Sequence, residues 1–241
     1  MKKIPIFFVC WFVLLLLLSA LVSSPLHYWR NTIQSNLIEG VILQQIDGRL
    51  WDGDARVSLP RLMTPVDLQW RFNFPLINVQ VTHPLFQGWG AASIGLDGAD
   101  IWVDQAQLDM GLFKPVAQSN GVSLNGSSFI IDRLFINVGY DTFVPRLWRG
   151  EGSLETINAD YRFNNDRKNI QIKGITVEWL TQEQESKMLV RSQEGKHLLT
   201  LEPTHQQELE IAIMPPLLNE VGINWSGKAD YPVAVLVEPL F

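Results

Sequence analysis

The sequence predicts a mainly β protein: an antiparallel, curved or twisted β-sheet domain with repeated hairpins, preceded by one transmembrane α-helix. Three observations lead to this fold class. The chain begins with a long uncharged apolar segment. From residue 41 onward, Gly, Pro, Asn and Asp interrupt the sequence every few residues, and the segments between them alternate apolar with polar residues. A tryptophan–glycine element also recurs along the chain. We therefore expect a start and membrane helix at 1–24, a juxtamembrane helical segment at 25–40, and a β-rich domain at 41–241.

The first element is the uncharged run from residue 4 to residue 22. About 20 apolar residues span a bilayer core when they form a helix. Lys2 and Lys3 precede the run, and the next basic residue is Arg30. Because loops rich in Lys and Arg stay in the cytoplasm, we expect a single-pass inner-membrane protein of a Gram-negative cell, with a cytoplasmic N-terminus and a periplasmic main domain. The anchor residues spaced along the run are Ile4, Phe8, Leu14 and Val22.

A cleaved signal peptide is the alternative interpretation of this segment. Cleavage after Ala20 would place the bulky Leu18 three residues before the cut, and cleavage after Ser24 would place Pro25 directly behind the scissile bond. The apolar run is also longer than the roughly 7–15 residues of a signal-peptide core. The sequence therefore favours an uncleaved anchor.

Two segments have helical patterns. Residues 25–38 carry apolar side chains at spacings of three and four, which gives one apolar stripe formed by Leu26, Trp29, Ile33 and Leu37. Residues 214–222 have two prolines directly after Met214 and end with a glycine, which is typical of a short helix.

The remaining elements are predicted strands. In residues 67–72, for example, Leu68, Trp70 and Phe72 alternate with polar residues and so fall on one face of a pleat. The other predicted strands are 41–46, 55–59, 101–108, 128–138, 153–163, 170–179, 188–192, 197–202, 208–214 and 231–237. Residues 182–193 form the most polar stretch after the anchor, and we interpret them as a solvated turn between strands.

The recurring element has the pattern Trp-x-Gly-x-(Ala/Gly). It occurs at Trp51 and Gly53, at Trp148 and Gly150, and at Trp225 and Gly227. Glycine permits close strand approach and the indole fills the adjoining interior, so the element predicts a hairpin used three times. The functional alternative is a tryptophan-lined surface that binds a carbohydrate, a lipid or a partner protein.

Composition and motifs exclude several function classes. The net charge is −6, and beyond residue 24 the chain has 17 basic and 25 acidic residues, a balance of −8 (17 − 25), which disfavours nucleic-acid binding. Cys10 is the only cysteine, and the four histidines lack metal-ligand spacing. No nucleophile elbow, phosphate-binding loop or dinucleotide-binding glycine motif occurs. We expect no enzymatic activity, no metal and no cofactor, with an envelope hydrolase assembled only in three dimensions as a third hypothesis.

Three segments together resemble a known family. Ile46-Asp47-Gly48-Arg49-Leu50-Trp51-Asp52-Gly53-Asp54-Ala55, Leu68-Gln69-Trp70-Arg71-Phe72 and Leu217-Leu218-Asn219-Glu220-Val221-Gly222 ahead of Trp225-Ser226-Gly227 are similar to type II secretion system protein N. The resemblance implies an accessory inner-membrane component that acts by protein–protein interaction in export across the outer membrane. Its partners would be other type II secretion components in the inner membrane and periplasm.

The same layout is similar to that of AsmA-like envelope proteins. That resemblance implies curved sheets associated with lipid handling, so a lipid- or amphiphile-binding protein is the alternative function. The direct partner and the oligomeric state stay open at this point.

Overall fold

The chain is mainly β in the computed structural model, with 64% of the described residues in strands. The structure describes residues 19, 23–37, 40–60, 62–119, 121–140, 145–163, 166–182, 185–204, 208–223, 225–228 and 231–239. These residues form two compact units, Met1–His83 and Pro84–Phe241. Every strand pairing within each unit is antiparallel, so the predicted antiparallel β class is confirmed.

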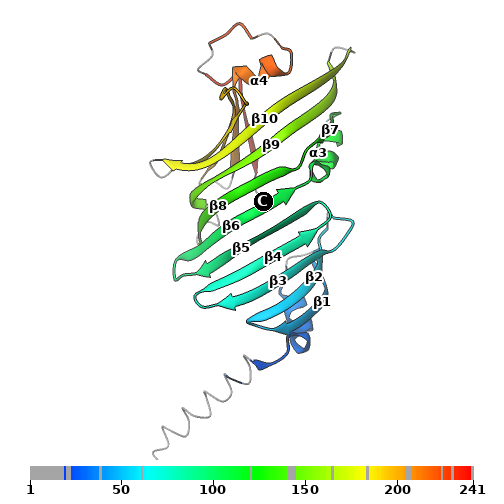
Figure 1. Cartoon of the computed structure of the whole chain (residues 1–241), viewed down its shortest axis with the longest axis vertical. Helices are drawn as coiled ribbons and strands as arrows, with labels where there is room; N and C mark the ends of the chain where they lie inside the picture. Colours follow the sequence, from blue (N-terminus) through cyan, green and yellow to red (C-terminus); the bar gives the residue numbers. More distant parts are fainter. Residues whose placement is uncertain are drawn as a thin grey trace, which may run out of the picture. The chain divides into compact units, whose positions relative to one another are not determined.

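Unit 1 contains a short helical segment and four strands (Figure 1). Its elements are η1 (Leu26–Trp29), α2 (Arg30–Ser35), β1 (Ile42–Arg49), β2 (Asp52–Ser58), β3 (Val66–Asn73) and β4 (Leu76–His83), and each strand pairs with the next. Leu43, Ile46 and Ala55 are buried on one face of this sheet together with Leu26 of η1. Helical structure is therefore confirmed over residues 26–35 of the predicted segment 25–38. Leu26 and Ile33 of the predicted stripe pack against the sheet, whereas Trp29 and Leu37 are exposed.

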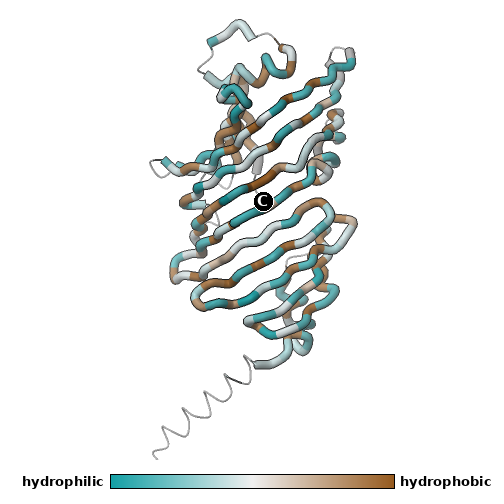
Figure 2. The backbone as a smooth tube through the Cα atoms, viewed as in Figure 1, coloured by the Kyte–Doolittle hydropathy of each residue, from teal (hydrophilic) through white to brown (hydrophobic). Residues whose placement is uncertain are grey.

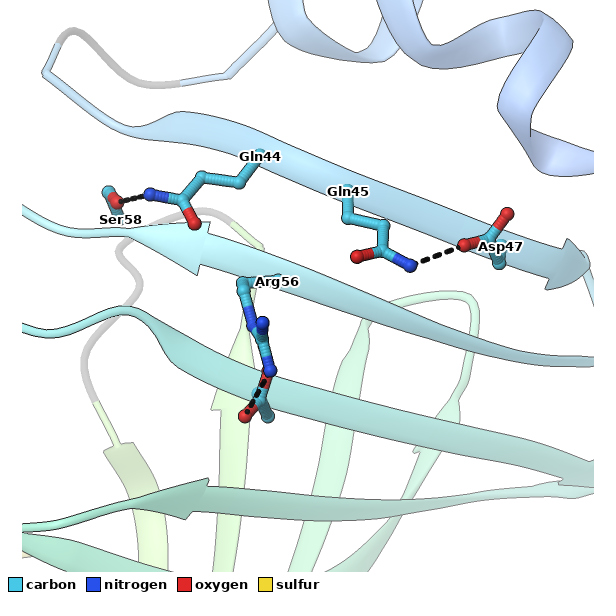
Figure 3. A network of polar contacts seen from close by, with 6 residues as sticks. Gln44, Gln45, Asp47, Arg56 and Ser58 are labelled. Carbon is cyan, nitrogen blue, oxygen red and sulfur yellow. Dashed lines mark hydrogen bonds and ion pairs between the residues drawn. The ribbon is translucent and has the colours of Figure 1, made fainter.

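The opposite face of unit 1 is polar (Figure 3). Arg56 donates to the carboxylate of Asp67 on the neighbouring strand over 2.7 Å, Gln44 donates to Ser58 over 2.7 Å, and Gln45 donates to Asp47 over 2.7 Å. The hydrogen bond from Arg56 lowers the pKa of Asp67. Because the pair is exposed, it contributes little to stability, and we take this face as the one that meets solvent.

The free edge of β1 is covered by side chains of the helical segment. Gln34 donates to the Val41 carbonyl over 2.9 Å and accepts from the Leu43 amide over 2.6 Å, while Arg30 donates to the Leu43 carbonyl over 3.2 Å. Unpaired backbone groups at a sheet edge promote association with other strands. In unit 1, these two side chains satisfy backbone groups that an added strand would otherwise bind.

Unit 2 is a larger antiparallel sheet with three short helical segments. Its strands are β5 (Phe86–Ile94), β6 (Gly98–Leu108), β7 (Ser123–Gly126), β8 (Phe129–Gly139), β9 (Pro145–Phe163), β10 (Asp166–Gln182), β11 (Glu185–Arg191), β12 (His197–Pro203), β13 (Glu208–Ile213) and β14 (Ala234–Pro239), with η2 (Met110–Leu112), α3 (Lys114–Ser119) and α4 (Pro215–Glu220). The spatial order is β5-β6-β8-β9-β10-β11-β12-β13-β14. The helix predicted at 214–222 is confirmed as α4.

Two long strands, β9 and β10, form the centre of unit 2 (Figure 1). β8 pairs with the first half of β9 and β7 pairs with the second half, so both lie along the same side of it. Ser127, between them, donates its amide to the Thr156 carbonyl over 2.9 Å and accepts from the Thr156 amide through Oγ over 3.0 Å. Hydrophobic and hydrophilic residues alternate along these strands, as a half-buried sheet requires (Figure 2).

One predicted element is wrong and several strands lack a sequence prediction. The solvated turn predicted at 182–193 is wrong for residues 185–191, which form β11, and the second half of β11 agrees with the strand predicted at 188–192. The charged side chains of β11 lie on one face, where Glu185 and Lys187 form an ion pair over 2.7 Å. On the other face, Ser186 is buried and Met188 and Val190 pack against the core. The strands β4, β5 and β7 have no counterpart in the sequence prediction.

The predicted membrane anchor lies outside the described residues. Ile4, Phe8, Leu14 and Val22 all belong to positions that the structure does not describe. In the part of the chain that is described, no helix combines the length and apolar character needed to cross a membrane.

Candidate functional site

The most extensive feature of unit 2 is an apolar face built from two cross-strand ladders. In each ladder, residues directly opposite one another on successive strands share one face of the sheet. The first contains Gly90, Val103, Leu134, Gly150, Trp179, Met188, Leu201, Ile211 and Leu236; the second contains Gly88, Ala106, Ile131, Gly152, Val177, Val190, Leu199, Ile213 and Ala234. Bulges on β6 and β8 keep the ladders in register. Every member is apolar or glycine, and Leu134, Val177 and Trp179 at the centre of the two ladders belong to the buried core of the unit.

Trp179 occupies the centre of this face. It is 7% exposed and lies directly opposite Gly150, with its ring 6.1 Å from that of Phe129. A Cβ atom added to Gly152 would lie 2.9 Å from the Phe129 ring and 3.1 Å from the Trp179 ring. Gly152 of β9 therefore leaves the space that the two aromatic rings fill, whereas Gly150 permits close approach of Leu134 on β8.

A groove of about 930 Å³ lies along β6, β8, β9 and β10. Trp102 and Phe135 face each other across β6 and β8 with ring centroids 5.5 Å apart, and Arg149 lies opposite Phe135 on β9. Leu147 and Leu180 extend the lining along β9 and β10. The volume is in the range of ligand sites, roughly 300–1,000 Å³, and the lining combines aromatic, aliphatic and charged groups.

Charged side chains of both signs border the groove. Arg133 lies opposite Glu151, and Glu151 lies opposite Glu178 on the next strand. Arg191 approaches Glu178 over 3.6 Å, with about half of each side chain exposed. The groove therefore has ionic groups of both signs along its border.

The structure separates the three tryptophan–glycine elements predicted from the sequence. Trp148 and Gly150 line the groove, and Trp148 donates its indole N–H to the Leu180 carbonyl over 3.0 Å. Trp51 and Gly53 belong to unit 1, at the start of β2. Trp225 and Gly227 lie in a loop of unit 2. The predicted hairpin is therefore wrong for the third element, where Trp225 is 41% exposed and its ring folds back against Gly227.

In the first element, the tryptophan that fills the space beside the glycine comes from the neighbouring strand. Trp70 lies opposite Gly53, and a Cβ atom on Gly53 would lie 2.6 Å from the Trp70 ring. In the second element, a Cβ atom on Gly150 would instead meet the Arg133 carbonyl oxygen and Leu134 of β8. The two glycines therefore have different packing partners.

Two of the described histidines, His83 and His197, have side-chain partners within the fold. His83 is buried, and its Nε2 atom lies 2.6 Å from Oγ1 of Thr64. His197 contacts Oγ1 of Thr200 over 2.9 Å. Over the described ranges, no group of three or more His, Cys, Asp or Glu residues could hold a metal ion.

Comparison with known proteins returns no match: no family model, no curated protein and no solved structure is similar to this chain. Its function must be inferred from its own residues.

Proposed function

We propose that the chain is a membrane-anchored accessory component of the type II secretion machinery and acts by binding other envelope proteins. In this proposal, residues 4–22 hold it in the inner membrane as a single span with the N-terminus in the cytoplasm. Residues 41–241 then form a curved or twisted periplasmic sheet region that contacts other secretion components.

The observation that carries this proposal is the way two segments of the family resemblance fit together. Residues 46–55 form most of the β1–β2 hairpin, and residues 68–72 belong to β3, which pairs with β2. Trp70 lies against Gly53 and donates its indole N–H to the Leu50 carbonyl over 3.0 Å. The two sequence segments thus form one interlocked element, which supports treating them as a single inherited motif.

Binding is also the activity that the site geometry favours. Trp102, Phe135 and Leu147 offer apolar contact area in the groove, and Arg149 and Glu151 beside them offer ionic groups. Aromatic residues and arginine are enriched where proteins bind one another.

Deleting the gene is expected to abolish or strongly reduce the release of secreted enzymes into the medium, and a plasmid copy of the full chain is expected to restore it. Release is measured as enzyme activity in the supernatant relative to the periplasmic fraction. A second plasmid, in which a cleavable export signal replaces residues 1–24, tests the anchor and is expected not to restore release. Unchanged release in the deletion strain would overturn the proposal.

Lipid or amphiphile binding is the second candidate, favoured by the two apolar ladders and the aromatic groove of unit 2. Native mass spectrometry of the detergent-purified chain is then expected to show bound lipid. Trp102→Ala removes the aromatic wall of the groove and should lower the occupancy, whereas Trp225→Ala, in the exposed loop, should leave it unchanged. A wild-type protein that carries no lipid would contradict this candidate.

A further inference from the structure

The last strand of unit 2, β14, has an exposed edge. β14 pairs with β13 along one side, and among the described residues no backbone partner occupies its other side. Val235, Leu236 and Val237 are 48%, 49% and 54% exposed. By alternation, Val235 and Val237 lie on one face of the sheet and Leu236 on the other. The edge is therefore apolar on both faces.

This edge also lacks the usual protection. Natural edge strands carry charges, prolines, bulges or a covering element that block further strand pairing. In β14, the run from Ala234 to Val237 is aliphatic, and the first charge and the first proline come at Glu238 and Pro239. The outer side of β1, in contrast, is covered by Gln34 and Arg30, which bind its backbone groups. The outer edge of β1 is therefore covered, whereas the outer edge of β14 is open to pairing.

We propose that β14 joins two copies of this chain edge to edge, in an antiparallel pair centred on Leu236. In that register, Leu236 faces Leu236 of the second copy and Val235 faces Val237. Ala234 faces Glu238, so no like charges are opposed. The pair has two-fold symmetry, which is the commonest symmetry of protein dimers. The sequence of β14 is thus self-complementary.

The ladders give a second reason to choose a second copy as the occupant. Leu236 ends the first apolar ladder of unit 2. In the proposed register, this ladder meets the same ladder of the second copy at the symmetry axis, so apolar residues continue across the interface on the same face. The inference concerns oligomeric state alone and does not depend on a role in secretion.

Cysteine cross-linking of the full chain in detergent tests the register. In a Cys10→Ser background, Leu236→Cys is expected to form disulfide dimers under mild oxidation. Residues directly opposite in an antiparallel pair have Cα atoms about 4.5–5.5 Å apart, which suits a disulfide. Val235→Cys and Val237→Cys should cross-link poorly alone, because their own copies lie diagonally at about 7–8 Å, but should cross-link when the two variants are mixed. Tyr231→Cys, at a position 64% exposed and outside β14, is the control and should stay monomeric.

Mass measurement without cross-linking supplies an independent readout. The wild-type chain is expected to have the mass of a dimer after correction for detergent, and Val237→Lys should shift it to a monomer because a charge then faces the apolar Val235 of the second copy. A monomeric wild type overturns the proposal. Tyr231→Cys dimers as abundant as those of Leu236→Cys, or cross-linking of Leu236→Cys to a different protein, would equally overturn it.

Discussion

Trp179→Ala is expected to lower the free energy of unfolding of unit 2 by about 3–5 kcal/mol. The indole is 7% exposed and belongs to the core that contains Leu134, Leu154 and Val177. Its removal leaves a cavity that cannot close easily, because the facing residues of β9, Gly150 and Gly152, have no side chains to move into it. The loss should be among the largest that a single truncation causes in this unit.

The effect is measured on the full chain in detergent by denaturant unfolding followed by far-ultraviolet circular dichroism. Amide hydrogen exchange then locates the loss, which should concentrate in β9, β10 and β11. Trp225→Ala removes the same side chain from an exposed loop and should change stability by less than about 0.5 kcal/mol. If the two variants lose similar stability, the packing described around Trp179 is wrong.

The strands around Trp179 show which parts of this fold the sequence predicts and which parts it does not. Alternation in residues 175–179 identifies β10, because Ile175, Val177 and Trp179 point to one side and Thr176 and Glu178 to the other. β5 shows no such signal, because Gly88 and Gly90 occupy two of its inward positions and carry no side chain. The first half of β11 is misread as a turn because its outer face carries Glu185 and Lys187, whereas the second half agrees with the strand predicted at 188–192.

The candidate site was predictable only in part. Trp148 and Gly150 are visible in the sequence as a motif, and they do line the groove. Trp102, Phe135 and Arg149 were not singled out, because they meet only through the pairing of β6 with β8 and of β8 with β9. Register across strands follows from hydrophobic pattern, turns and bulges together. The bulges in β6 and β8 shift that register by a residue, which no local pattern in the sequence reveals.

Gly53→Ala is expected to destabilise unit 1 by about 1–3 kcal/mol through overpacking. An added Cβ atom would lie 2.6 Å from the Trp70 ring, 2.7 Å from the Asp47 carbonyl oxygen and 3.1 Å from that of Arg49. Denaturant unfolding of the full chain measures the loss, and hydrogen exchange should assign it to β1, β2 and β3. Gly95→Ala is the matched control, because the nearest atom there is a carbonyl oxygen at 3.3 Å, so a smaller loss is expected.

A double-mutant cycle separates the two causes of the clash at Gly53. Trp70→Leu removes the ring that would lie nearest to the new methyl group, but it leaves the backbone oxygens of Asp47 and Arg49 in place. Gly53→Ala should therefore cost less in the Trp70→Leu background than in the wild type, with a coupling of about 0.5–3 kcal/mol, but it should not become neutral. Equal losses in both backgrounds would show that the indole does not require the glycine. In that event, the Gly53–Trp70 contact would not be the structural basis of the tryptophan–glycine motif in unit 1.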